Sequence, residues 1–138
     1  MRRSVWAFSA GVVTWIVVVS VLNLLMRLEM SGYAVAEPAM AFSLAMKWGR
    51  LTLAIIASLV TGLVVASLAP ANKRLPLILG TALLGVFIPV HYGLWDKFPL
   101  WYHLVFLSSL IPAVLAGARV RERVENRRMS AQSTVTGH

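Results

Sequence analysis

The chain has 138 residues, of which 59% are apolar and only 13% are charged, and its net charge is +8. A soluble domain is nearer about 45–50% apolar and about 25% charged, so the excess apolar surface requires a lipid bilayer as partner. The absence of cysteine excludes disulfides, thiol catalysis and cysteine-ligated metal sites. Because most basic residues flank apolar stretches, the positive charge indicates membrane topology, and we expect no nucleic-acid partner.

Four apolar stretches predict an all-α integral membrane protein, folded as a four-helix bundle. A helix needs about 20 apolar residues to cross the hydrocarbon core, and an open strand edge cannot be satisfied in lipid. We expect the helices to pair as two antiparallel transmembrane hairpins, within one domain that covers residues 1–118. The predicted spans cover about residues 5–26, 38–69, 75–92 and 99–118.

The second span has an ambiguous beginning. Residues 39–46 are apolar, Lys47 to Arg50 interrupt them, and a further apolar run follows from Leu51. One interpretation is a single long helix, continuous from Pro38, that tilts or projects from the bilayer. The other is an interfacial segment that turns near Gly49. We favour the continuous helix, in which the two cations lie inside the outer leaflet, partly snorkelling toward the surface.

The basic residues predict the orientation. Nine of them precede the first span, separate the second from the third or follow the fourth, and four lie on the other side. Since cytoplasmic loops are enriched in Lys and Arg, both termini are predicted to be cytoplasmic. Small size and the lack of cysteine or an organellar signal favour a bacterial inner membrane. Residues 119–138 form a basic cytoplasmic tail, and we expect its end, from Ser130 to His138, to be disordered because it lacks an apolar period.

Several tyrosine and tryptophan residues fall at the predicted outer ends of the spans. Rings with a polar tip favour the headgroup layer, which predicts an interfacial belt. The members of this belt are Tyr33, Trp48, Tyr92, Trp95, Trp101 and Tyr102.

The second span carries a stripe of small side chains that recurs every fourth residue. Such a stripe lets helices approach closely in lipid and predicts helix packing, within the chain, in a homo-oligomer or against a membrane protein partner. The stripe consists of Ala54, Ser58, Gly62 and Ala66.

Polar residues collect at the predicted outer level and form a candidate outer-face cluster. We expect Arg27 to pair with Glu37, and Arg50 or Lys47 with Asp96. The cluster is interpreted either as a site for an anionic ligand or lipid headgroup, or as interfacial residues that anchor helix ends. Its members are Asn23, Arg27, Glu37, Lys47, Arg50, His91, Asp96 and His103, with Lys97 beside them.

The sequence leaves the function open among three classes. We favour a non-enzymatic binding or accessory component of the membrane, with no catalytic residues, no cofactor and no metal. The first alternative is a small oligomeric transporter with its site at the outer cluster, although no carboxylate lies in the middle of a span. The second is a redox subunit in which His91 and His103 ligate haem or a metal, although their spacing matches no fixed motif.

Overall fold

The computed structural model describes residues 2–136, and within that range every regular element is a helix. The elements are α1 (Arg2–Glu29), α2 (Tyr33–Ala36), α3 (Leu44–Leu68), α4 (Leu75–Gly93) and α5 (Leu100–Thr136). Four of them, α1, α3, α4 and α5, are long and apolar enough to cross a membrane. The expectation of an all-α chain with four candidate membrane spans is confirmed.

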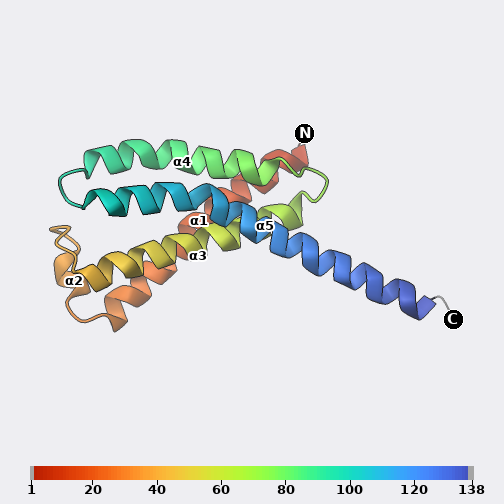
Figure 1. The fold of residues 1–138 in the computed structure, drawn as a ribbon, viewed down its shortest axis with the longest axis horizontal. Helices are drawn as coiled ribbons and strands as arrows, with labels where there is room; N and C mark the ends of the chain where they lie inside the picture. Colours follow the sequence, from red (N-terminus) through yellow and green to blue (C-terminus); the bar gives the residue numbers. More distant parts are fainter. Residues whose placement is uncertain (1, 137–138) are drawn as a thin grey trace.

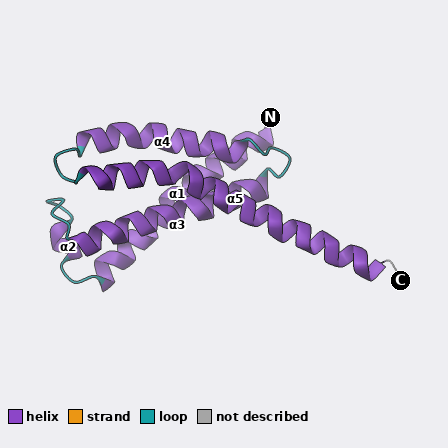
Figure 2. Cartoon of the chain, in the orientation of Figure 1, coloured by secondary structure: helices purple, strands orange, loops and turns teal. Residues whose placement is uncertain are grey.

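The four long helices form a bundle with two distinct ends (Figure 1). At one end lie α2 and the loop between α4 and α5, and we call it the α2 end. The N-terminus and the loop between α3 and α4 lie at the opposite end, which we call the N-terminal end. The connections are short loops and turns, and the last part of α5 extends away from the bundle as a single helix (Figure 2).

Helix α3 begins later than the sequence predicts. It starts at Leu44, where the Ser43 side chain accepts a hydrogen bond from the Met46 backbone N–H, and it passes Gly49 without a break. Before it, Met40 adopts a left-handed backbone with φ of 54°. Neither a helix continuous from Pro38 nor a turn near Gly49 is therefore present, because the serine cap sets the beginning of the helix.

The tail continues the last span as a helix. Helix α5 continues through Thr136, and His138 lies outside the described residues. Residues after Arg119 are rich in arginine and also include glutamate, which favour helix. An ion pair one turn apart, between Arg121 Nη1 and Glu125 Oε2 at 3.0 Å, adds to that preference.

The small residues of α3 face the inside of the bundle, where Gly62 contacts α5 and Ser58 contacts Trp15 of α1. Ala54 and Ser58 are buried, Gly62 is buried and Ala66 is half-buried. A Cβ added to Gly62 would lie 1.9 Å from the backbone oxygen of Val114 on α5, and one added to Gly117 would lie 1.9 Å from the backbone oxygen of Leu59 on α3.

The two helix backbones are thus in direct contact at a crossing where only glycine fits. The sequence stripe on α3 has a counterpart on α5, Ala113 and Gly117, that the sequence analysis missed although the two residues show the same four-residue spacing.

Helix α1 joins the bundle through a narrow stripe that comprises Ala7, Gly11 and Trp15. A Cβ on Gly11 would lie 2.5 Å from Val65 of α3 and 2.6 Å from Leu79 of α4. Most of the other apolar side chains of α1 are exposed, as expected for a helix whose outer face contacts lipid.

Candidate functional site

The polar residues at the α2 end are brought together by the connection between α1 and α3. Gly32 adopts a left-handed conformation with φ of 78°, which turns the chain into the single turn of α2. This turn places Tyr33 in the bundle interior, where its side chain is fully buried. Glu37, which follows α2, places its carboxylate beside the end of α1.

A continuous chain of hydrogen bonds then crosses from α1 to α3. Arg27 Nε pairs with Glu37 Oε2 at 3.1 Å, and Asn23 Nδ2 donates to Glu37 Oε1 at 2.8 Å. The Tyr33 hydroxyl donates to Asn23 Oδ1 at 2.7 Å and accepts from Arg50 Nη1 at 2.7 Å. We call these five residues the polar network.

The network agrees with one expected ion pair and differs from the other. Arg27 and Glu37 are paired as the sequence predicts. Arg50 does not pair with Asp96, because it donates to Tyr33 and its guanidinium lies over the ring of Phe42, 4.7 Å from the centroid. Asp96 and Lys97 lie exposed in the loop between α4 and α5, and Lys47 is half-buried one turn before Arg50.

Arg50 has a buried hydrogen-bond donor that is not used. Its Nε is buried and finds no hydrogen-bond partner among the described residues. A buried donor without a partner costs about 1–3 kcal/mol, more for a charged group. The group therefore marks a place where a bound acceptor would stabilise the protein.

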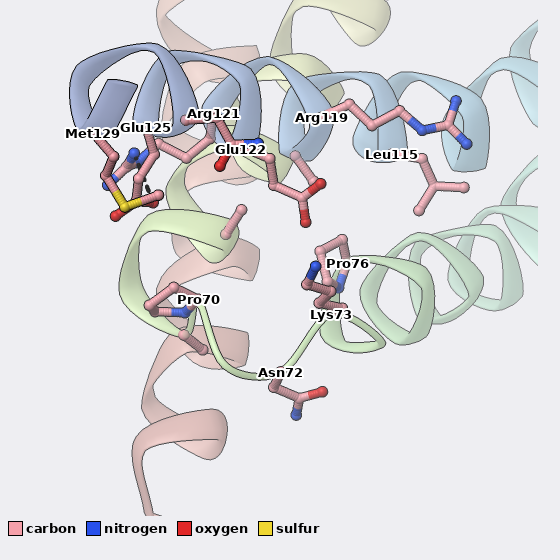
Figure 3. A pocket seen from close by; sticks show the side chains of 14 residues that line it. Pro70, Asn72, Lys73, Pro76, Leu115, Arg119, Arg121, Glu122, Glu125 and Met129 are labelled. Atoms are coloured by element: carbon pink, nitrogen blue, oxygen red, sulfur yellow. Dashed lines mark ion pairs between the residues drawn. The ribbon is translucent and has the colours of Figure 1, made fainter. Parts of the chain in front are cut away.

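Another cavity, of about 420 Å³, lies at the N-terminal end, between α5 and the loop after α3 (Figure 3). Among the residues that line it, the structure shows no buried polar group without a hydrogen-bond partner. Basic and acidic side chains alternate around it, and Glu122 points toward Lys73 and Pro76. Each polar side chain in its lining is at least partly exposed, so water can satisfy it.

Arg50 lines a second cavity, of about 260 Å³, whose lining includes residues from all four long helices. Its polar lining consists of Ser20, Asn23, Glu37, Arg50 and Tyr102. The rest of the lining is apolar, half aromatic and half aliphatic: Trp15, Val19, Leu53, Ala54, Phe87 and Phe106. We call this space the Arg50 cavity. It combines a few placed polar groups with apolar walls, as ligand pockets commonly do.

The position of the Arg50 cavity follows from the way the helices separate. Helices α4 and α5 diverge from α1 and α3 toward the α2 end (Figure 1). Trp15 of α1 and Phe87 of α4 are in contact, with ring centroids 4.9 Å apart. The Trp15 indole N–H donates to Ser58 at 3.1 Å, which fixes the ring. This aromatic pair bounds the cavity on the side that faces the N-terminal end.

The two histidines lie outside the polar network but directly against each other. His91 Nδ1 and His103 Nδ1 are 2.7 Å apart, and both side chains are buried. Aromatic rings surround them, including Trp95, which stacks on His103 at 5.0 Å, and Phe106, whose centroid is 4.4 Å from that of His91. His103 Nε2 has no hydrogen-bond partner among the described residues.

The histidine geometry is that of a direct hydrogen bond between α4 and α5. With metal–nitrogen bonds of about 2.0–2.1 Å, two nitrogens bound to one metal are about 2.9 Å apart at a right angle, about 3.4 Å apart at a tetrahedral angle and about 4 Å apart on opposite sides. The observed separation of 2.7 Å is the usual length of a direct hydrogen bond. Within residues 2–136, side chains that commonly bind metals do not gather in groups of three or more.

Two residues of the site were assigned other roles in the sequence analysis. Tyr33 and Tyr102 were expected in an interfacial belt, yet both are buried and line or support the Arg50 cavity. Gly32 next to Tyr33 is the available signal, because a left-handed turn there redirects the ring inward. Trp48 remains exposed, as expected at an interface, and stacks on Trp101 with centroids 5.3 Å apart.

Comparisons of the chain with protein-family models, with curated proteins and with solved structures found no match.

Proposed function

We propose that this protein is a non-enzymatic, membrane-embedded binding protein whose ligand presents an anionic group to Arg50. The observation that carries the proposal is the buried, unpartnered Nε of Arg50, a residue that lines a cavity between the helices. A cation within a membrane span is costly to place there and usually has a partner and a purpose.

The charges of the polar network support an anionic ligand. Its ionised members are Arg27, Glu37 and Arg50, and the single carboxylate is already bonded to both Arg27 and Asn23. One positive charge is therefore left without a counter-ion in the network. A bound monoanion would neutralise it and accept the free hydrogen bond.

The same geometry favours binding over acid–base catalysis. Both oxygens of Glu37 are engaged, and the Tyr33 hydroxyl donates and accepts within the network. A group whose hydrogen bonds are satisfied in the resting protein holds its neighbours in place. Transport by an oligomer and a redox role of His91 and His103 remain the alternatives, and a coloured purified protein would favour the latter.

For orientation we propose a bacterial inner membrane, two antiparallel hairpins and cytoplasmic termini, which puts the Arg50 cavity in the outer half of the bilayer. The uneven distribution of basic residues supports this. The chain has no cysteine, so single cysteines report cleanly on topology. In intact spheroplasts, a membrane-impermeant maleimide should label Asp96→Cys and spare Asn126→Cys; the reverse pattern would overturn the orientation.

Native mass spectrometry of protein released gently from membranes tests the binding function. We expect a non-covalent adduct above the 15.1 kDa chain. The adduct should be lost in Arg50→Met and kept in Lys47→Met, a matched control that removes a positive charge one turn away. Bare protein in all three preparations, or an adduct indifferent to Arg50→Met, would refute the proposal.

A further inference from the structure

The Arg50 cavity has an edge on the lipid-facing surface, between α1 and α4. Val19 and Ser20 of α1 and Phe87 of α4 belong to its lining. Ser20 is exposed, and Val19 and Phe87 are half-buried. These three residues define what we call the α1–α4 window. A ligand in the cavity can reach the window without displacing the tightly packed crossing of α3 and α5.

The polar and the apolar lining residues of the cavity succeed one another along α1. Asn23 of the polar network lies one turn from Val19, about 6 Å along α1 at about 1.5 Å per residue. Trp15 lies one turn further toward the N-terminal end. A molecule with a polar head beside Arg50 would therefore pass its remaining atoms along apolar walls and out through the window within one helical turn.

The size and charge of the site restrict the head group. A volume of about 260 Å³ accommodates a small terminal group and the first few carbons of a chain. The network leaves one positive charge uncompensated, which a monoanion matches. A phosphodiester head carries substituents on two sides, whereas a terminal carboxylate carries one and is the smaller group for the polar part of this cavity, which is lined by α1, α3, α5 and Glu37. A terminal carboxylate satisfies both conditions.

Building on the proposed function, we propose that the ligand is a single-chain amphiphile with a terminal carboxylate, a long-chain fatty acid, that enters laterally from the bilayer through the α1–α4 window. Its carboxylate accepts from Arg50 Nε, and its chain lies against Trp15 and Phe87 before it leaves between α1 and α4. The binding is non-covalent, so no bond is made or broken.

Trp15 provides a direct reporter, because it lines the cavity. A variant in which the other tryptophans, Trp6, Trp48, Trp95 and Trp101, are phenylalanine isolates its fluorescence. In micelles of a non-brominated detergent, a fatty acid brominated in mid-chain should quench this signal saturably. A fatty alcohol brominated at the same carbons is the matched control for the head group, and it should quench only weakly and without saturation.

Two pairs of variants separate the head-group contact from the route of entry. Arg50→Met should weaken fatty-acid binding by about tenfold or more, because charge-assisted hydrogen bonds are the strong ones, and Lys47→Met should leave it unchanged. Ser20→Phe fills the window and should abolish saturable quenching. Val17→Phe, at an exposed position on α1 that does not line the cavity, should not.

The outcomes distinguish this inference from the function on which it rests. Equal quenching by acid and alcohol, or binding unaffected by Ser20→Phe, would overturn the fatty-acid assignment. The fatty-acid inference fails and the binding function stands under two combined results. Arg50→Met loses the co-purified adduct, and inorganic phosphate, but not a fatty acid, displaces the adduct from the wild-type protein.

Discussion

The crossing of α3 and α5 offers the sharpest test of how the fold is held together. In Gly62→Ala, the new Cβ would lie 1.9 Å from the Val114 backbone oxygen, and Cβ contacts below 3.0 Å essentially never occur. The helices must therefore separate locally by at least about 1.1 Å, the difference between these two distances. A backbone oxygen in a packed helix cannot rotate away as a side chain can.

The cost of this separation can be worked from the contacts that it opens. A gap of about 0.5–1 Å forfeits about a quarter to a half of each dispersion contact. The reciprocal contact of Gly117 with Leu59 opens at the same time, and so does the packing of Ala57 against Val114. Overpacking a core costs about 1–3 kcal/mol, and we expect Gly62→Ala to lie at the upper end, about 3 kcal/mol.

The assay is reversible unfolding in mild detergent by titration with sodium dodecyl sulfate, followed by tryptophan fluorescence. Gly85→Ala is the matched control, because a Cβ there meets no atom within 4 Å and the residue lies exposed on α4. We expect the control to fall within about 0.5 kcal/mol of the wild type, as surface substitutions usually do. If Gly62→Ala behaves like the control, the close approach of α3 and α5 is not what stabilises the bundle.

Three further predictions use the same titration. Tyr33→Phe removes the hydroxyl that joins α3 to α1 and should cost about 1–3 kcal/mol; an unchanged midpoint would show that the polar network adds no stability. Replacing either His91 or His103 by phenylalanine orphans its partner, so the double variant should be less destabilised than the sum of the single ones; strict additivity would argue against their hydrogen bond. Deleting residues 130–138, whose helical part extends away from the bundle, should leave the midpoint within about 0.5 kcal/mol, and a larger loss would reveal contacts of this arm with the bundle.

The membrane-spanning elements were predictable because length and hydropathy determine them. Each of the four long helices contains an apolar run of about the length that a bilayer requires. The beginning of α3 was not predictable from hydropathy, because residues 39–43 are as apolar as a helix interior. The positive φ of Met40 and the cap of Ser43 decide it, and both depend on local backbone geometry.

The sequence was sufficient to predict that the polar residues of the candidate site lie near the same ends of the helices. It was not sufficient to predict most of their contacts. Arg27 and Glu37 are close in sequence and of opposite charge, so their pairing follows from the short connection between them. The partner of Arg50 is Tyr33, and α2 alone brings the two together. His91 and His103 flank one loop, so their proximity was expected, but their direct contact depends on how α4 and α5 rotate.

The distribution of side-chain size along the bundle explains why a cavity forms where it does. Toward the N-terminal end, glycines such as Gly11, Gly62 and Gly117 let helices touch backbone to side chain or backbone to backbone. Toward the α2 end, one core cluster is built largely from rings: Tyr33, Phe42, Phe98, Tyr102 and Phe106. Large rings hold α4 and α5 apart from α1 and α3 there, while the glycines close the opposite end. The same gradient that splays the helices thus leaves a cavity lined by Arg50, so substitutions that relax the glycine crossing should alter ligand binding without touching the ligand.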